Sequence, residues 1–324
     1  MRLEYQILAA VVLDGILGDP RWLPHPVRGI GWLASQLEGP ARRMIRSERL
    51  AGIATALAVI ASAGGIAWGL VKLTGLLHPL AADAVSVVLI YASIAARDLA
   101  RHSMAVFRAM VAGDLEQARR RVAMMVGRDT DRLDESGVVR AAVESVAEGA
   151  VDGVAAPLLY ALLAGPAGAI AYRAINTLDS TFGYTTDRYL RFGWASARTD
   201  DLANLIPARV TAPLMCLAAA LLGERPLQAL RTLLRDGRKH ASPNAGLPEA
   251  AMAGALGVQL GGRACYDGQP VEKPTIGQPL VPLAPCHIRR ANALMFVTTG
   301  LLLALGMAVR SLVIHLWSAW SAAA

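Results

Sequence analysis

The sequence predicts an all-α protein that crosses a membrane several times, and three observations lead to this fold class. Hydrophobic residues make up 54% of the 324 residues and aromatic residues only 5%, so the apolar mass is aliphatic. The mean hydropathy of +0.41 is high for a water-soluble domain, whose surface must remain polar. The aliphatic residues also gather into runs that can cross about 30 Å of hydrocarbon. We therefore expect a polytopic helical bundle with about 4–6 spans.

The apolar runs predict the spans in order along the chain. They cover residues 50–77, 80–96, 151–174, 205–222 and 293–317. The first two form a helical hairpin, and the Gly64-Gly65 pair in the first offers close helix contact. Pro157 and Gly165-Pro166 interrupt the third, which predicts a bent or re-entrant helix. The number of crossings requires one re-entrant segment, at Gly165-Pro166 or at 207–223, and both alternatives stay open.

The charge distribution predicts the orientation of the spans. The formal net charge is +7, and the basic residues lie in loops and near span ends rather than in one block. This pattern favours anionic lipid headgroups as partners and argues against nucleic acid. Basic residues flank both ends of the first hairpin, which places 18–49 and 97–150 in the cytoplasm by the positive-inside rule. We expect one polytopic membrane domain over 1–324, with extramembrane segments at about 18–49, 97–150, 173–204 and 224–292. Within the last segment, residues 262–286 predict an ordered loop or a short extended excursion.

Three carboxylates recur at four-residue spacing ahead of the third run. Glu144, Glu148 and Asp152 would therefore share one face of a helix that runs into apolar sequence. Like charges in such a row repel, and acids at a membrane boundary are costly unless they line a functional cavity. Hard oxygen ligands favour Mg²⁺ over zinc. The alternative is a solvated helix face.

A dense polar tract covers residues 172–188. Arg173, Asn176 and Asp179 share a helix face in it, with Thr177 alongside, so a phosphate or carboxylate and its metal could be held there. Asp200, Asp201, Asn204 and Arg209 form a second such cluster before a span. For each cluster the structural alternative is a network that anchors helices at the interface.

Two turns complete the candidate sites. The N-terminal apolar stretch, residues 3–17, imitates a signal peptide, but Asp14 and the lack of a cleavage site favour its retention. Asp19 and His25 come after this stretch, and they could belong to a functional site or only to a turn that ends a helix. The turn from Ser242 through Asn244 to Gly246 opens a small-residue helix and could aim backbone amides at an anion, or serve as an ordinary cap.

Taken together, these tracts resemble the CobD/CbiB family of cobalamin biosynthesis, the membrane-bound adenosylcobinamide-phosphate synthases. They cover nearly the full length in family order, and their combination is highly specific. The matching elements are Asp14 with Gly18-Asp19-Pro20 and His25-Pro26-Val27; Glu144-Ser145, Glu148 and Asp152-Gly153; Asn176-Thr177-Leu178-Asp179-Ser180 and Gly183-Tyr184; Asp200-Asp201, Asn204 and Pro207-Ala208-Arg209; and Ser242-Pro243-Asn244-Ala245-Gly246 with Pro248-Glu249.

The resemblance implies an ATP- and Mg²⁺-dependent amide ligation. The ring D propionate of adenosylcobyric acid would be joined to aminopropanol or its phosphate, in the cell (inner) membrane with the active site facing the cytoplasm. Ethanolamine as the amine, a homo-oligomer, and contact with other late corrinoid-pathway membrane proteins are left open. A poor electrophile such as a carboxylate needs metal, phosphate binding and a base.

These implications assign roles to the candidate residues as hypotheses. The Mg²⁺ ligands would be Glu144, Glu148, Asp152 and Asp179, with Asp200 and Asp201 as second candidates. The catalytic residues would be Asp19, His25, Glu148 and Asp179. Substrate and phosphate would be bound by Arg173, Asn176, Thr177, Arg209, Ser242, Asn244 and Gly246. The general base stays open between His25 and Asp19. The rival functions are a membrane transporter, which expects an inverted repeat that is not visible here, and a membrane signalling modulator.

Overall fold

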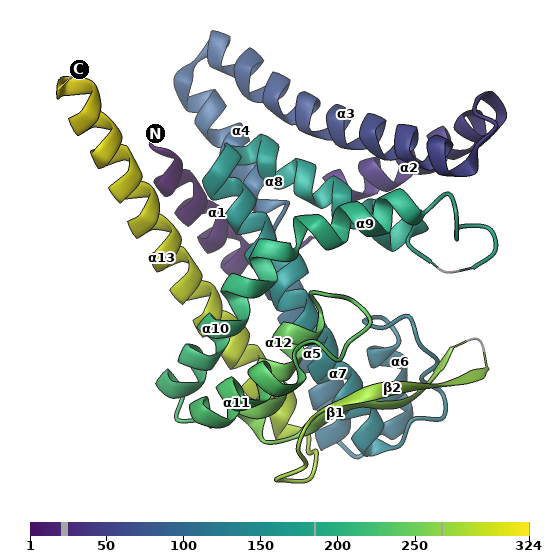
Figure 1. The fold of residues 1–324 in the computed structure, drawn as a ribbon. Coiled ribbons are helices and arrows are strands. Elements are labelled where there is room, and N and C mark those ends of the chain that lie inside the picture. Colours follow the sequence, from purple (N-terminus) through teal and green to yellow (C-terminus); the bar gives the residue numbers. More distant parts are fainter. Residues whose placement is uncertain (21–24, 185, 267, 324) are drawn as a thin grey trace. The chain divides into compact units, whose positions relative to one another are not determined.

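The computed structural model describes residues 1–20, 25–184, 186–266 and 268–323 (Figure 1). The chain divides into two compact units. Unit 1 consists of Met1–Ala95, Ala156–Asn204 and Ala304–Ala324, and unit 2 of Ala96–Ala155 and Leu205–Leu303. Because each unit is assembled from separated stretches of sequence, no linker between them is visible in the chain.

The described part of the chain is helical apart from one hairpin, so the all-α fold class is confirmed. Unit 1 contains α1 (Leu3–Leu17), α2 (Pro26–Met44), α3 (Glu48–Leu77), α4 (Pro79–Tyr91), α8 (Ala156–Phe182) and α9 (Trp194–Ala203). Unit 2 contains α5 (Ala96–Val111), α6 (Leu115–Val122), α7 (Glu135–Gly149), the π-helix η1 (Ala150–Ala155), α10 (Leu205–Leu221), α11 (Pro226–Asp236), α12 (Gly246–Leu256), β1 (Gln259–Tyr266) and β2 (Gln269–Gly277). Helix α13 (Cys286–Ala323) contributes to both units.

Several helices are long and apolar enough to cross a bilayer, as expected of a multi-pass membrane protein. The described residues contain 4 such segments, or 5 if α9 and α10 count as one broken span. The 4 segments are Glu48–Leu77, Pro79–Val111, Glu135–Phe182 and Cys286–Ser318. This number lies within the predicted range, and the segments include the predicted hairpin, the bent helix and the C-terminal span.

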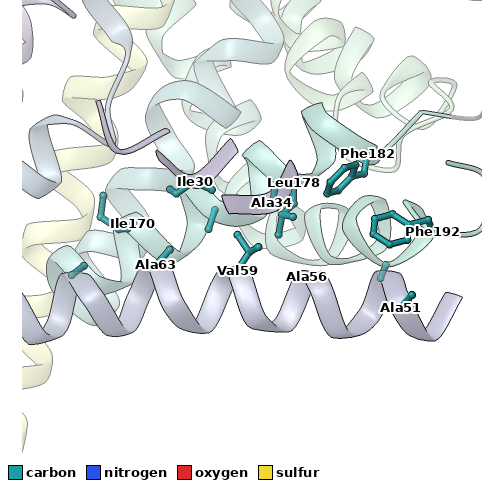
Figure 2. Close-up of a cluster of buried hydrophobic side chains, with 13 residues drawn as sticks. Ile30, Ala34, Ala51, Ala56, Val59, Ala63, Ile170, Leu178, Phe182 and Phe192 are labelled. Atoms are coloured by element: carbon teal, nitrogen blue, oxygen red, sulfur yellow. The ribbon is translucent and has the colours of Figure 1, made fainter. Parts of the chain in front are cut away.

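The core of unit 1 forms where α3 packs on α2 and α8 (Figure 2). Buried residues recur every four positions along α3, at Ala51, Thr55, Val59, Ala63 and Ala67, and the alanines among them let the neighbouring backbones approach closely. Of the Gly64-Gly65 pair predicted for close contact, Gly64 faces α8, where a Cβ would lie 3.4 Å from the Ala171 methyl group, whereas Gly65 faces open space, so the prediction is wrong for Gly65. Small side chains therefore set the packing of the spans, as they do in membrane bundles generally.

Helix α8 is broken where the sequence predicts. Gly165 has φ 64° and ψ −155°, a conformation that favours glycine, and Pro166 follows it. Pro166 has no N–H to donate to the carbonyl of Leu162, four residues earlier. Arg310 of α13 donates to that carbonyl instead at 3.0 Å, and it also pairs with Glu4 of α1 at 2.8 Å. The break is thus stabilised by a charged side chain within unit 1.

Unit 2 differs from the sequence prediction in two elements. Residues 259–277 form an antiparallel hairpin, with Gln259 paired to Gly277 and an irregularity between Leu260 and Gly262. The extended excursion predicted for 262–286 is therefore a hairpin that begins earlier than expected. The other difference is η1, a π-helical turn between α7 and α8. Such turns insert one residue into the helical repeat and often lie at functional sites.

Candidate functional site

Glu144 of α7 holds the hairpin of unit 2 in place. One of its oxygens accepts from the Gly261 amide at 2.7 Å, and the other accepts from the Arg128 guanidinium at 2.5 Å. The side chains of Glu144 and Arg128 are only 12% and 5% exposed. Arg140 of α7 adds a bond to the Arg263 carbonyl at 3.0 Å. Glu144 therefore positions the hairpin, and both of its carboxylate oxygens already have protein partners.

The other two members of the acidic row have different surroundings. Glu148 is exposed near the end of α7, and Asp152 is half-buried within η1. Because η1 has a wider turn than an α-helix, Asp152 is rotated away from the strict four-residue alignment that the sequence predicts. The row thus consists of one buried positioning carboxylate and two more accessible ones.

The turn before α12 satisfies its own amides. The Ser242 hydroxyl oxygen accepts from the Asn244 and Ala245 amides at 3.3 and 3.4 Å. The Asn244 side chain in turn accepts from Arg209 at 3.2 Å. Gly246 packs tightly, since a Cβ there would lie 2.7 Å from the Gly237 carbonyl oxygen. The Ser242 oxygen thus occupies two amides of the turn ahead of α12, whose N-cap residue Ala245 has no side-chain cap, and the turn contacts the exposed Arg209.

Glu249 of α12 is a buried acid that sequence reasoning included in a motif without giving it a role. It is 6% exposed, and burial, reinforced by the negative charges of Glu144 and Glu148, raises the pKa of its carboxyl well above the usual value. His240 lies in the same electrostatic neighbourhood, where burial and then the charge of Lys273 lower the pKa of its imidazole. Both groups are thus biased toward their neutral forms. Their signal in the sequence was the Pro248-Glu249 pair directly after the turn.

In unit 1, α8 and α9 build a separate polar network around Asp200. One Asp200 oxygen accepts from the Asn204 amide at 3.0 Å and the other from Asn176 at 3.5 Å. Tyr172 fixes Asn204 by donating to its side-chain oxygen at 2.8 Å. The structure therefore brings together two residues predicted from the polar tract and from the second cluster. Neutral donors orient the Asp200 carboxylate without neutralising it, and each of its oxygens keeps capacity for another ligand.

The remaining candidates of unit 1 lie near this network or at the start of α2. Thr177 donates back to the Arg173 carbonyl at 2.6 Å, and Asp201 pairs with Arg198 at 3.2 Å. Asp179 lies on α8 beside Gly183, whose amide donates to the Asp179 carbonyl oxygen at 2.6 Å. These contacts stabilise the helix end and leave the roles assigned from the resemblance as predictions.

Asp19 and His25 lie together at the start of α2. Their side chains approach to 3.8 Å, and His25 also caps α2 by accepting from the Val27 amide at 3.3 Å. The residues between them, 21–24, lie outside the described part of the chain. The structure therefore pairs the two base candidates that the sequence left open.

The donor sets fit a metal ion that takes few protein ligands. Across the described ranges, no group of three or more histidine, cysteine, aspartate or glutamate side chains is placed to hold one ion. Mg²⁺ is commonly bound by one or two carboxylates, with phosphate and water completing its shell. Asp200 in unit 1 and Glu148 in unit 2 are single carboxylates of the kind that such a site uses.

These features define a polytopic helical membrane protein whose two units each contain a cluster of acids and cations at helix ends. A family model described as CobD/Cbib protein matches residues 7–295, and the chain belongs to this family. The match includes all of the candidate residues discussed above. No solved structure matches the chain.

Curated relatives agree with this assignment over almost the whole chain. A protein named cobalamin biosynthesis protein CobD from Geobacter metallireducens is 54% identical over 299 residues, which is 92% of this chain and 94% of the relative. Proteins of the same name from Leptospira interrogans and Klebsiella pneumoniae are each 45% identical, over 92% and 93% of this chain and 94% and 95% of the relatives. The similarity is therefore not confined to the apolar spans.

Proposed function

We propose that this chain is an amide ligase of the cell (inner) membrane that joins an amino alcohol to a corrinoid carboxylate. Membership of the CobD/Cbib family gives it a role in cobalamin biosynthesis. The specific reaction that we propose is attachment of aminopropanol, or its phosphate, to the ring D propionate of adenosylcobyric acid at the expense of ATP. The observation that carries the proposal is the family match over residues 7–295, which contains every candidate site residue.

The proposed chemistry balances in two steps. The propionate oxygen attacks the γ-phosphorus of ATP, which releases ADP and forms an acyl phosphate. The amine then attacks the acyl carbon, phosphate leaves, and the nitrogen loses a proton to a base. Bound Mg²⁺ would neutralise charge on the transferring phosphoryl group. The protein residues have to bind the phosphates, hold the carboxylate and accept the proton.

The contacts divide these tasks among the candidates. Arg209, fixed through Asn244, supplies a positive charge for phosphate at the start of α12. Glu148 and Asp152 in unit 2, and Asp179, Asp200 and Asp201 in unit 1, are the carboxylates that we assign to Mg²⁺. Glu144 is assigned to positioning, because both of its oxygens bind protein groups. Asp19 can take the proton from the amine, and His25, whose Nδ1 accepts from the Val27 amide and whose Nε2 faces Asp19, can orient that carboxylate.

Product identification tests the proposal directly. Purified full-length protein is incubated with adenosylcobyric acid, ATP, Mg²⁺ and one amine at a time, and the corrinoid product is identified by mass. We expect an amide product and amine-dependent ADP release, both abolished without Mg²⁺. A single amine that gives product also decides between aminopropanol, its phosphate and ethanolamine. Absence of any amide product with all three amines would refute the ligase proposal.

A matched pair of variants tests the metal assignment. Glu148→Gln should lose Mg²⁺-dependent ATP turnover by at least 100-fold while still inserting into membranes. Glu116→Gln on α6 is the control, since Glu116 is 75% exposed and pairs with Arg120 on its own helix. Full turnover in the Glu148 variant would remove that residue from the metal site. ATP consumption in detergent, where no second compartment exists, separates an enzyme from a carrier, and loss of turnover in single-acid variants separates it from a signalling protein.

A further inference from the structure

Helix α11 of unit 2 presents an apolar stripe that no other described element covers. Leu227, Leu230 and Leu234 are 68%, 44% and 78% exposed, and their spacing of three and four residues puts them on one face. The opposite face is buried, with Ala229, Thr232, Leu233 and Asp236 packed inward. Three leucines in a row on a helix surface are unusual for a face that contacts only water.

The contact with α12 fixes which face of α11 points outward. Gly254 of α12 meets the α11 backbone so closely that a Cβ there would lie 2.5 Å from the Gln228 carbonyl oxygen and 2.6 Å from the Ala229 Cα. Asp236 adds a second anchor by accepting from the Gly277 amide of β2 at 2.9 Å. Rotation of α11 that would bury the leucines is therefore excluded by backbone contact on its inner side.

Basic side chains border the leucine stripe. Arg231 follows Leu227 by four residues on the helix and so lies on the outward side, and Arg238 is exposed in the turn that follows α11. Within the part of the chain that the structure describes, neither Arg231 nor Arg238 forms an ion pair, whereas Arg235 is held by Asp236. The only acid of α11 is Asp236, which is fully buried. The outward face is therefore apolar and positive, without negative charge.

The position of α11 in the chain points to lipid as the partner. Helix α10, which forms part of a candidate broken span, ends at Leu221, and α11 begins at Pro226 after a turn at Gly223. Leu221 and Leu222 at this end are 64% and 37% exposed, so exposed apolar side chains extend to the turn that leads into α11. A second copy of the chain docking through the same face would bring Arg231 and Arg238 toward their equivalents, which like-charge repulsion disfavours.

We propose that α11 is an interfacial helix that binds anionic phospholipids. Leu227, Leu230 and Leu234 insert among the acyl chains, and Arg231 and Arg238 extend to the lipid phosphates. This combination of a leucine face with bordering arginines is characteristic of helices that lie in the membrane plane, and each basic side chain adds attraction to an anionic surface. The proposal concerns membrane binding and holds whichever reaction the protein catalyses.

Nitroxide accessibility in the full-length protein tests this placement. Leu234→Cys is made in a chain that also has Cys265→Ser and Cys286→Ser, and it is spin-labelled in nanodiscs of phosphatidylcholine with or without phosphatidylglycerol. Labels at Leu57→Cys on the span α3 and at Glu116→Cys on α6 provide references. Leu234 and Leu57 are 78% and 64% exposed, so both positions tolerate the label.

We expect the label at position 234 to collide with oxygen more than with a water-soluble nickel complex, as the label at position 57 does, and to move deeper when phosphatidylglycerol is present. The combined changes Arg231→Gln and Arg238→Gln should abolish that lipid-dependent shift. Nickel accessibility equal to that of position 116 would place α11 in water and overturn the proposal. Shielding from both reagents would indicate a protein partner and would also overturn it, and an equal depth in both lipids would refute the recognition of anionic headgroups.

Discussion

Replacement of Glu144 by glutamine separates a positioning role from a metal-binding role. The glutamine oxygen can still accept from the Gly261 amide, so the hydrogen bond to the hairpin, 2.7 Å long in the wild type, is retained. The charge opposite Arg128 is lost. Arg128 is 5% exposed, and its Nε atom has no hydrogen-bond partner among the described residues, so its guanidinium depends on Glu144 for compensation.

The magnitude follows from the burial of this pair. Removal of one partner from a buried ion pair costs about 3–5 kcal/mol, because the other charge stays buried and uncompensated. At roughly 2–4 °C per kcal/mol, the value for a folding unit of about 150–250 residues, the melting temperature of unit 2 should fall by roughly 6–20 °C. Replacing both charges, as in Glu144→Gln with Arg128→Met, should recover most of this loss.

The assay combines melting with turnover. Both variants and the wild type are heated in the same detergent at one scan rate, because membrane proteins often unfold irreversibly and their apparent melting temperatures then depend on the rate. ATP turnover is measured well below the melting range. If Glu144→Gln melts like the wild type but loses Mg²⁺-dependent turnover, the carboxylate is a metal ligand and the positioning argument is wrong.

Other buried groups of unit 2 give three further expectations. Glu249→Gln should have a higher melting temperature than the wild type at pH 8 and the same melting temperature near pH 4. Because the pKa of Glu249 is raised in the folded protein, the wild type loses stability as pH rises above the unfolded pKa of about 4.3. Melting curves recorded across this pH range check the expectation. Asp236→Asn should melt below the wild type at neutral pH, with a difference that shrinks as pH falls below about 4, because Arg235, and then Lys239 and the Gly277 amide, lower the pKa of the native carboxyl. Gly261→Ala should speed proteolysis of the hairpin, because the new Cβ would lie 2.1 Å from the Pro274 carbonyl oxygen and the residue has φ 76°. Gly268→Ala is the control, since Gly268 has the same φ but open space around the Cβ position, and it should have a smaller effect.

Features that depend on local sequence were predicted well. The spans follow from hydropathy alone, and the break in α8 follows from Gly165-Pro166, whose conformational limits act within one helical turn. Asn176 and Asp200 are 24 residues apart in sequence and pair in the structure. Both were candidates from the sequence, because polar residues beside apolar runs need partners.

Features that depend on distant pairing were missed or incomplete. The hairpin was expected only as an extended excursion, because its glycines and prolines weaken any strand pattern. Glu144 meets Gly261 across 117 residues, and nothing in the local row of acids distinguishes a carboxylate with two partners from a metal ligand. The π-helical turn around Asp152 is equally invisible, since the spacing of residues 144, 148 and 152 fits an uninterrupted α-helix.

The broken helix α8 has a consequence for how hydropathy should be interpreted in this protein. Arg310 interrupts the apolar C-terminal span, and a scale of single residues counts it as a penalty. Its guanidinium serves the Leu162 carbonyl that Pro166 leaves without a donor, so the two unfavourable residues compensate one another. Exchange of Arg310 for leucine would lengthen the hydrophobic segment on paper while removing a donor to the buried Leu162 carbonyl and the ion-pair partner of Glu4. The more hydrophobic chain would be the less stable membrane protein.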